Sequence, residues 1–431
     1  MNLTQLTKPV MEVYGENYTL RWTDGPYITL VDFNAHSNKE ITAEIEVYDD
    51  AELEPFLYPP TRVTINKSFS TTIRELSEVS ARPDWRQRFG QVKKLVLPHY
   101  KSGTPIISLG AMDPPEPIRE ELEGVLWQGL PTVVYGAGGI GKSAICLAWA
   151  SAVHTGTTVA NLKAHQSNVL YLDWETSDRL TYWRNKELLD AKGISHGTWA
   201  DPERPESGRT GMVFYRYMSG PLWDDLPFLR AEVERLNIGT VCIDSASPAC
   251  GGEPENAKAT DSFFSALRGL SPAHQPVQSI ILAHVTHEAR KSGKRSSPFG
   301  SVFWLNQPRN VFELDSVQEK NATHTDMGLY HVKSNTGPLR SEQGFRLTWG
   351  GGHMTVEDLN IREHNKLSKK LADTDRAEIF LLTEGPTPIR DLAEELDLNN
   401  HRSLASQLSS DDRFASVNGK WEAVEPLGVN A

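Results

Sequence analysis

From about residue 118 onward, short apolar segments alternate with longer stretches of helical composition. This alternation is typical of a mostly parallel sheet, because strands joined by helices are covered on both faces and are therefore apolar throughout. The expected strands of this α/β fold are Thr132–Tyr135, Asn168–Asp173, Met212–Tyr217, Thr240–Asp244 and Ser279–His284. The expected helices are Lys142–Val153, Ser177–Lys192, Asp225–Leu236 and Asp261–Leu270. Three later segments are expected to extend the sheet with antiparallel strands: Asn310–Leu314, Gly328–Lys333 and Phe345–Trp349.

The sequence predicts a smaller module on each side of this core, which is assigned residues 118–361. Residues 1–105 have the composition of an α+β module, and the proline-rich residues 106–117 are expected to link it to the core. The elements expected there are strands at Tyr18–Trp22, Tyr27–Phe33, Ile41–Tyr48 and Arg62–Ile65, and a helix at Thr71–Ser80.

A second, basic linker is predicted at residues 362–373, before a C-terminal module of residues 374–431. The pattern there indicates helices at Thr374–Leu382, Ile389–Leu396 and Ser403–Ser409, then a hairpin with an Asn-Gly turn at its tip. Three helices and a hairpin resemble a winged helix, a module that contacts either DNA or another protein.

Composition limits the classes of protein that fit. The formal net charge of −12 argues against a surface covered with nucleic-acid-binding side chains, but it leaves room for a local basic channel. No run of about 18 apolar residues is present and the first residues lack a signal-peptide pattern, so no membrane association is expected. Cys146, Cys242 and Cys250 have neither CxxC nor metal-ligand spacing. Because Cys146 and Cys242 fall in apolar segments, we expect buried free thiols in a cytoplasmic protein.

A glycine-rich segment between the first expected strand and helix fits GxxxxGK[ST] at every fixed position. In this context the glycines let backbone N–H groups surround phosphates, and the helix N-terminus adds positive potential. The motif predicts binding of ATP, with Lys142 on the β- and γ-phosphates and Ser143 on Mg²⁺. The residues expected to form the nucleotide site are Gly136, Gly138, Gly139, Ile140, Gly141, Lys142, Ser143 and Ala144.

Two carboxylates follow later core strands. Asp244 ends an apolar strand about 100 residues after the P-loop, which suits a residue that holds Mg²⁺ together with Ser143. Glu175 follows the second core strand, where a carboxylate can orient the attacking water. A plain acidic residue at a helix N-terminus is the alternative for Glu175, and Asp173 is a lesser candidate for its role.

The order of these residues resembles the RecA-like P-loop ATPases, in particular the plasmid RepA-type and DnaB-type hexameric helicases (AAA_25-like). In that subgroup the glutamate follows the second core strand, as Glu175 does, whereas AAA+ proteins place it beside the aspartate that Asp244 matches. The resemblance covers roughly residues 118–350. It implies an RecA-like core, a homo-hexameric ring and single-stranded DNA as partner, and it leaves room for other replication or recombination proteins.

The resemblance also assigns roles to later residues. His284 matches a histidine that contacts the γ-phosphate and couples it to DNA-binding loops; a metal site with His287 and a plain surface histidine are the alternatives. Arg309 matches an arginine finger that reaches the neighbouring subunit's ATP. Lys333 matches a family lysine and is an expected auxiliary, since Asn335 stands where the family has arginine. The loop residues expected to touch nucleic acid are Arg290, Lys291, Lys294 and Arg295; a solvated charge run is their alternative.

Three hypotheses follow for the whole chain. The first is an ATP-driven hexameric helicase or translocase on single-stranded DNA, acting in DNA replication. The second is a recombination mediator or loader ATPase, and the third is an ATP-gated switch that binds a protein partner. All three keep the ATP site, because a RecA-like core serves several functions.

Overall fold

The computed structural model describes the residues in nine ranges: 8–14, 17–35, 40–48, 61–79, 84–102, 116–194, 212–272, 275–285 and 302–424. These residues fall into two compact units. One comprises the chain up to Ile118 with Leu226–Glu234 and Ser265–Pro276, and the other comprises the rest. No helix among the described residues is long and apolar enough to cross a membrane.

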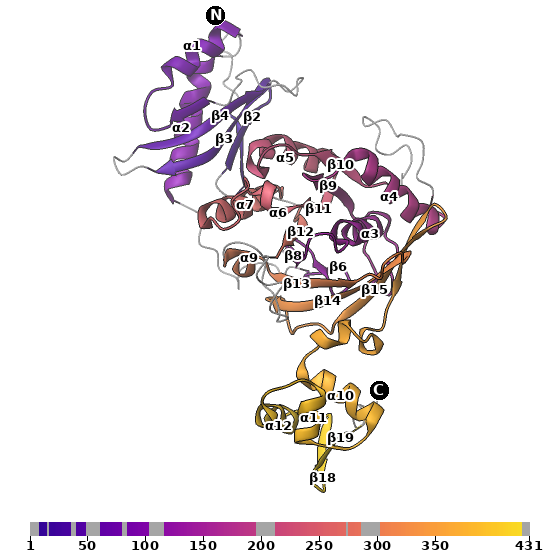
Figure 1. Ribbon diagram of the computed structural model, residues 1–431. Coiled ribbons are helices and arrows are strands. Elements are labelled where there is room, and N and C mark those ends of the chain that lie inside the picture. Colours follow the sequence, from indigo (N-terminus) through magenta and orange to yellow (C-terminus); the bar gives the residue numbers. More distant parts are fainter. Residues whose placement is uncertain are drawn as a thin grey trace, which may run out of the picture. The chain divides into compact units, whose positions relative to one another are not determined.

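A nine-stranded mixed sheet is the centre of the second unit (Figure 1). Its strands lie in the order β10-β9-β11-β12-β8-β13-β14-β15-β16. The first five in sequence are β8 (Pro131–Gly136), β9 (Asn168–Asp173), β10 (Phe214–Tyr217), β11 (Ile238–Asp244) and β12 (Gln278–His284). They pair parallel to one another, as their apolar sequences predict. The sheet then continues with β13 (Asn310–Val317), β14 (His324–Ser334), β15 (Gln343–Gly350) and β16 (His353–Asp358).

One prediction about the sheet is wrong in part. The segment that begins at Asn310 was expected to be antiparallel, but β13 pairs parallel with β8 and antiparallel only with β14. The N–H of Arg309 donates to the carbonyl of Pro131, so the chain has returned to the amino end of β8 before β13 starts. The direction of β13 is thus decided by where the preceding connection ends. Strand β14 pairs antiparallel with β15, and β15 pairs antiparallel with β16. Strand β16 was not predicted from the sequence.

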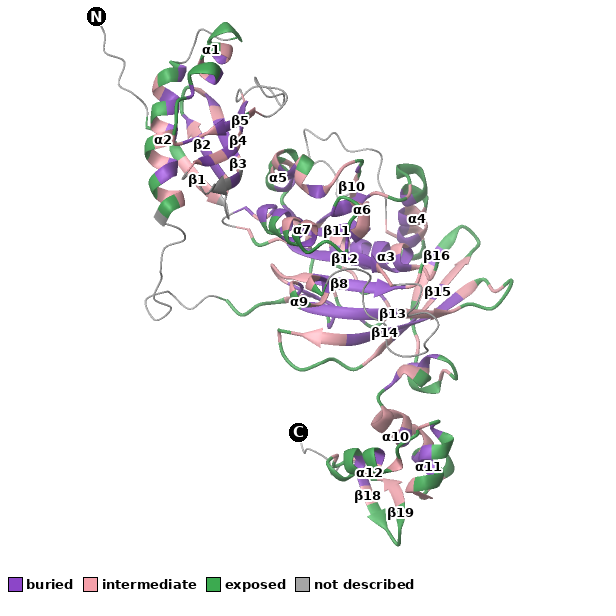
Figure 2. Cartoon of the chain, turned by 60° about the vertical axis from the view of Figure 1, so that its left-hand side comes forward, coloured by how far each residue is buried: buried purple, intermediate pink, exposed green. Residues whose placement is uncertain are grey.

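The central strands are buried on both faces, as Figure 2 shows in purple. Helix α3 (Lys142–Thr155) packs against one face, where it shares a hydrophobic core with Val134, Cys242 and Ile280. Cys146, Cys242 and Cys250 are free and buried, which confirms the burial expected for the first two. The other elements of the second unit are β6 (Glu120–Leu122), β7 (Leu126–Trp127), α4 (Asp178–Ala191), α6 (Ala246–Ala249), most of α7 (Ala257–Gly269) and α9 (Phe303–Asn306). Helix α5 (Leu226–Arg235) and the end of α7 are grouped with the first unit.

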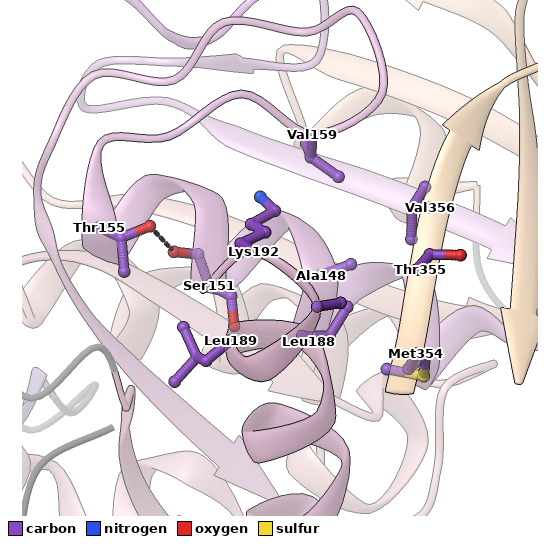
Figure 3. Close-up of a pocket in the computed structure, with 11 residues that line it drawn as sticks. Ala148, Ser151, Thr155, Val159, Leu188, Leu189, Lys192, Met354, Thr355 and Val356 are labelled. Carbon is purple, nitrogen blue, oxygen red and sulfur yellow. Dashed lines mark hydrogen bonds between the residues drawn. The ribbon is translucent and has the colours of Figure 1, made fainter. Parts of the chain in front are cut away.

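A cavity of about 190 Å³ lies between α3, α4 and β16 (Figure 3). Apolar side chains such as Ala148, Leu188 and Met354 form most of its wall, and Lys192 stands at its side. The Lys192 Nζ donates to the carbonyl of Thr158 at 2.7 Å, and burial lowers the pKa of this amine. None of the residues predicted to bind nucleotide lines this cavity, so we regard it as a packing defect between the helices and the sheet edge.

The described residues 8–102, called the N-terminal module below, have a sheet of their own. Five antiparallel strands lie in sequence order: β1 (Val10–Tyr14), β2 (Asn17–Trp22), β3 (Gly25–Ala35), β4 (Ile41–Tyr48) and β5 (Thr61–Thr64). Two helices follow, α1 (Ser70–Val79) and α2 (Trp85–Ser102). The sequence analysis missed α2, whose Phe89, Val92 and Val96 pack into the core beneath the sheet.

The C-terminal residues 373–424 also form a core of their own. Their elements are α10 (Asp373–Glu384), β17 (Thr387–Pro388), α11 (Ile389–Glu395), α12 (His401–Ser409), β18 (Phe414–Val417) and β19 (Lys420–Ala423). Asn418 and Gly419 both have positive φ, as a two-residue hairpin turn requires. The segment predicted as a basic linker carries two short 3₁₀ turns instead, in which Leu367 and Leu371 are buried against Tyr330.

Gly136, the last residue of β8, provides a test of how closely the sheet is packed at that point. A Cβ at this position would lie 2.4 Å from the carbonyl oxygen of Leu314 on β13, so Gly136→Ala forces two backbones apart. We expect a loss of about 1–3 kcal/mol in the free energy of unfolding, measured by denaturant titration. Gly350→Ala is the matched control, because a Cβ there meets nothing within 4 Å. An equal effect of the two substitutions would contradict this account.

Candidate active site

The predicted catalytic residues come together at the carboxyl ends of four neighbouring strands. The order β9-β11-β12-β8 places these ends side by side, and each strand stops close to its neighbour's last residue. Gly136 is paired with His284, and Asp244 is paired with both Asp173 and Leu282. The loops that follow these strands therefore share one edge of the sheet.

The P-loop connects β8 to α3, as its motif predicts. Helix α3 starts at Lys142, and its N-cap residue Gly141 has φ +90°, a conformation that side chains disfavour. Gly139 likewise has φ +77°. A Cβ on Gly141 would also lie 2.5 Å from the Cε of Met327, but this methyl group ends a flexible side chain that can move, so it is the backbone conformation that requires glycine here. The loop thus has the conformation in which glycine is needed to wrap backbone amides around an anion.

The side chain of Lys142 points back into the P-loop. Its Nζ donates to the carbonyls of Gly136 at 3.0 Å and Ala137 at 2.8 Å, and it lies 3.3 Å from Nδ1 of His284. Because an ammonium only donates, Nδ1 of His284 is the acceptor in this contact. The other ring nitrogen, Nε2, lies 3.4 Å from the carboxylate of Glu175, to which it can donate. His284 therefore bridges the P-loop lysine and the glutamate.

Glu175 is held in an ionised state by its neighbours. Hydrogen bonds from His284 and then Ser245 lower the pKa of its carboxyl to about 2 against the opposing effect of burial, and Lys142 adds to this electrostatically. The side chain stays 41% exposed, so water can reach it. A charged, solvent-accessible carboxylate beside the P-loop lysine fits a group that orients and activates water.

Asp244 lies deeper, with only 3% of its surface exposed. Burial raises the pKa of its carboxyl, while hydrogen bonds from Tyr171 and Ser143 lower it; the Tyr171 hydroxyl donates to Oδ2 at 2.7 Å. The hydroxyl of Ser143 is thus in contact with the carboxylate, as expected for two residues that share a metal ion. The charged form of a buried carboxylate is destabilised unless a cation offsets its charge. The pair fits Mg²⁺, which prefers one or two protein oxygens together with phosphate and water.

Asp173 does not share the role considered for Glu175. Its side chain is fully buried and accepts hydrogen bonds from the N–H groups of Glu175 and Thr176, both at 2.9 Å, and from the Tyr215 hydroxyl at 3.1 Å. Asp173 is therefore a positioning residue that fixes the turn carrying Glu175. The N–H of Trp174 donates to the carbonyl of Asp244 at 2.7 Å, which ties the same turn to the end of β11.

Two residues of the site were missed in the sequence. Tyr171 looks like an ordinary strand residue, and only the pairing of β9 with β11 shows that its hydroxyl reaches Asp244. Ser245 donates its hydroxyl to Glu175 from the residue after Asp244, across a cis peptide bond. Neither contact has a sequence signal, because each joins residues about 70 positions apart in the chain.

Arg309 and Lys333 lie at the other edge of the sheet. Asn310 is paired with Thr132, near the amino end of β8, while the P-loop starts at its carboxyl end. Four residues of strand separate these ends by roughly 13 Å. Arg309 is exposed, and the Nζ of Lys333 donates to the carbonyls of Asn306 and Pro308 at 3.0 and 2.7 Å. Neither residue joins the nucleotide site of its own chain.

The remaining predicted residues lie outside the described part of the chain. These are the basic loop residues Arg290, Lys291, Lys294 and Arg295, and His287. Within the described residues, no group of three or more His, Cys, Asp or Glu is placed to hold a metal ion. The site at Asp244 and Ser143 has one carboxylate and one hydroxyl, so it is a different kind of site from such a cluster.

The contact between Tyr171 and Asp244 generates a prediction. Because the Tyr171 hydroxyl lowers a carboxyl pKa that burial has raised, Tyr171→Phe raises this pKa further, and Asp244 becomes protonated at higher pH. When the pH is lowered, Mg²⁺-dependent binding of a fluorescent ATP analogue should therefore weaken at a higher pH in the variant than in the wild type. Tyr215→Phe is the matched control, since that hydroxyl donates to Asp173 instead. A shift of similar size in the control would show that the effect is not specific to Asp244.

Comparison with protein families agrees with this geometry. Residues 102–290 match the family model AAA_25, described as an AAA domain. The matched segment contains the P-loop, Glu175, Asp244 and His284, and it ends before Arg309 and Lys333. AAA_25 is a family of P-loop ATPases that includes RecA-like and DnaB-like helicases. Residues 102–290 are therefore similar to a P-loop ATPase domain of the AAA_25 family, and the match covers less than half of the chain.

Proposed function

We propose that the protein is an ATP-driven, ring-forming motor that acts on single-stranded DNA as a helicase or translocase in DNA replication. The observation that carries this proposal is the split of the expected machinery between two edges of one sheet. Lys142, Asp244, Glu175 and His284 meet at the carboxyl edge, while Arg309 lies at the amino edge, roughly 13 Å away. Because Arg309 lies at the opposite end of β8 from the P-loop of its own chain, we propose that it acts on the nucleotide of another copy.

The carboxyl edge supplies the groups for hydrolysis. When bound, Mg²⁺ and ATP supply the electrophilic phosphate, and Ser143 and Asp244 would hold the ion. The Nζ of Lys142 would exchange its hydrogen bonds to the carbonyls of Gly136 and Ala137 for hydrogen bonds to the phosphates, because a charged acceptor binds an ammonium more strongly than a neutral carbonyl does. Glu175, ionised over the whole physiological pH range, orients the attacking water.

The amino edge supplies groups to the next copy. Arg309 is exposed, and Lys333 lies beside it, held by the turn of residues 306–308. A contact that joins the carboxyl edge of one copy to the amino edge of another is head-to-tail, and such contacts close into a ring when the rotation between copies permits. We propose that Arg309 is the finger of a homo-hexamer and that Lys333 assists it; such a finger contributes about 10³-fold or more in rate.

His284 is the proposed relay between nucleotide and DNA. It touches Lys142 with one ring nitrogen and Glu175 with the other, and the basic segment with Arg290, Lys291, Lys294 and Arg295 follows it in the chain. When Lys142 moves toward phosphate, the Nδ1 acceptor of His284 loses its donor. The ring can then turn, and with it the start of the basic segment that we propose contacts single-stranded DNA.

The C-terminal residues 373–424 support a further contact in the same function. Their order is helix, strand, helix, helix, strand and strand, with the Asn418-Gly419 turn between the last two strands. We propose that they form a winged helix with α12 as its exposed helix. A partner DNA or a replication or recombination protein would bind there.

Because the proposed site combines residues of two copies, we expect a mixture of two inactive variants to regain ATPase activity. Glu175→Gln should retain nucleotide binding and lose about 10²–10⁴-fold in turnover, because the amide cannot activate water. Arg309→Ala should also bind nucleotide without turnover. In a mixture, about a quarter of randomly assembled interfaces combine an intact Glu175 with an intact Arg309 from the next copy. Steady-state ATPase assays of the mixture should therefore recover activity that neither variant shows alone. A mixture of Glu175→Gln with Lys142→Ala is the control. Both substitutions damage the carboxyl edge, so no interface in this mixture has an intact site and no ATPase activity should be recovered.

Single-stranded DNA should stimulate ATP hydrolysis, and a non-hydrolysable ATP analogue should convert the protein into a hexamer in mass measurements. Strand displacement on a forked duplex then distinguishes a helicase from a mediator or loader. If DNA leaves the ATPase rate unchanged, the motor proposal is wrong and the protein acts as a switch for a protein partner. If a single subunit saturated with nucleotide hydrolyses it at full speed, the ring is wrong as well.

A further inference from the structure

Helix α2 of the N-terminal module has a charge opposite to that of the whole chain. The chain carries a net charge of −12, yet the 18 residues of α2 include five Lys or Arg and no Asp or Glu. No motif of the ATPase domain accounts for this segregation, since α2 ends at Ser102, where the family match begins.

The basic residues of α2 divide into two groups with different tasks. Arg88 is buried; it bonds to the carbonyl of Pro26 and the carboxylate of Asp24, and it stacks on Trp22. Lys93 is half-buried and donates to the carbonyls of Asn66 and Lys67. Both residues stabilise the module itself.

Arg86, Lys94 and Lys101 form the other group, called the basic face below. All three are exposed, and no described side chain forms an ion pair or hydrogen bond with them. Trp85, Phe89 and most other apolar residues of α2 belong to the core shared with the sheet, and the three basic residues belong to the exposed part of the helix. Lys94 and Lys101 are seven residues apart, which places them on one side of the helix with a rise of about 10 Å between them.

Acidic side chains elsewhere in the module are mostly occupied. Asp24 is paired with Arg88, Glu40 with Lys67, and Glu44 with Arg62. Of the rest, Asp84 caps the start of α2 through the N–H of Gln87. Glu75 and Glu78 belong to α1, which is packed against α2. Within α2 itself, no acidic side chain offsets the charge of the basic face.

We propose that the basic face binds the phosphate backbone of a polynucleotide strand. Regularly spaced cations on one side of a rigid helix match a linear array of phosphates, and the exposed Gly90 between Arg86 and Lys94 lets a strand approach the helix backbone. The face carries no exposed aromatic side chain on which bases would stack. Binding is thus electrostatic and independent of sequence, with similar affinity for oligo-dT and oligo-dA.

This site lies outside the ATPase domain and requires no hydrolysis, so it goes beyond the proposed motor. It gives the N-terminal module a role in holding nucleic acid. The experiment below can succeed even if DNA fails to stimulate the ATPase, because it measures binding rather than turnover.

The test compares two double variants of the full-length protein. Lys94→Glu with Lys101→Glu reverses the basic face, and Lys163→Glu with Lys320→Glu changes the net charge equally at two exposed lysines of the other unit. Binding to fluorescent oligo-dT and to a duplex is measured by anisotropy between about 50 and 200 mM salt. Loss of two phosphate contacts should flatten the slope of log K against log salt by about 1.4 on single strands and about 1.8 on duplex. The control pair should keep the wild-type slope.

The neutral double variant Lys94→Gln with Lys101→Gln removes the two positive charges without adding glutamates that repel phosphate. It should flatten the slope of log K against log salt by the same amount as the glutamate pair. Circular dichroism and ATPase rate without DNA should be unchanged in all variants. The proposal is overturned if both charge-reversal pairs weaken binding equally, if neither does, or if the wild type binds no oligonucleotide. It is also overturned if polyglutamate binds through Lys94 and Lys101 while oligonucleotides do not, because the partner is then an acidic polypeptide.

Discussion

Parallel pairing of β9, β11, β12 and β8, with their ends aligned, is the constraint on which the site depends. In a parallel sheet every loop that follows a strand emerges at the same edge, so segments more than 100 residues apart meet there. The pairing of Gly136 with His284 brings the P-loop to the histidine, and the pairing of Asp244 with Asp173 brings Glu175 to Ser245. A shift of one residue in either register would separate these groups by about 3 Å and turn the side chains to the opposite face.

Close contact between backbones keeps that register in place. Gly136 has no room for a Cβ against the backbone of β13, and the Met327 side chain of β14 covers Gly141. The P-loop is thus packed against the strands that also carry Arg309 and Lys333 at their other ends. A continuous sheet of this kind fixes the distance between the edge with the P-loop and the edge with Arg309, and the proposed action of Arg309 on another copy depends on that distance.

The local environment of each charged side chain, rather than the net charge of the chain, determines its electrostatic behaviour. At the carboxyl edge, two carboxylates have opposite environments: Glu175 is exposed and its pKa is about 2, whereas burial raises the pKa of Asp244. This difference fits the two roles proposed for them, activation of water by Glu175 and binding of a cation by Asp244. In the N-terminal module, α2 carries five basic residues and no acidic one, while Asp24 and Glu40 are paired within the fold. A chain with a net charge of −12 can thereby keep cationic surfaces where anions would bind.

The sequence by itself determined the elements whose signals are local. The apolar runs of the parallel strands, the glycines of the P-loop and the Asn418-Gly419 turn each follow from backbone conformation or burial within a few residues. Only the tertiary structure decided what depends on distant pairing. It made β13 parallel, assigned Asp173 to holding the Glu175 turn, and brought Tyr171 to Asp244. It also showed α2, whose apolar pattern in the sequence is interrupted by Gly90 and Pro98. This segment is helical because its apolar side packs against the sheet. Such contacts join residues that no local pattern relates, so strand order and register alone fix them.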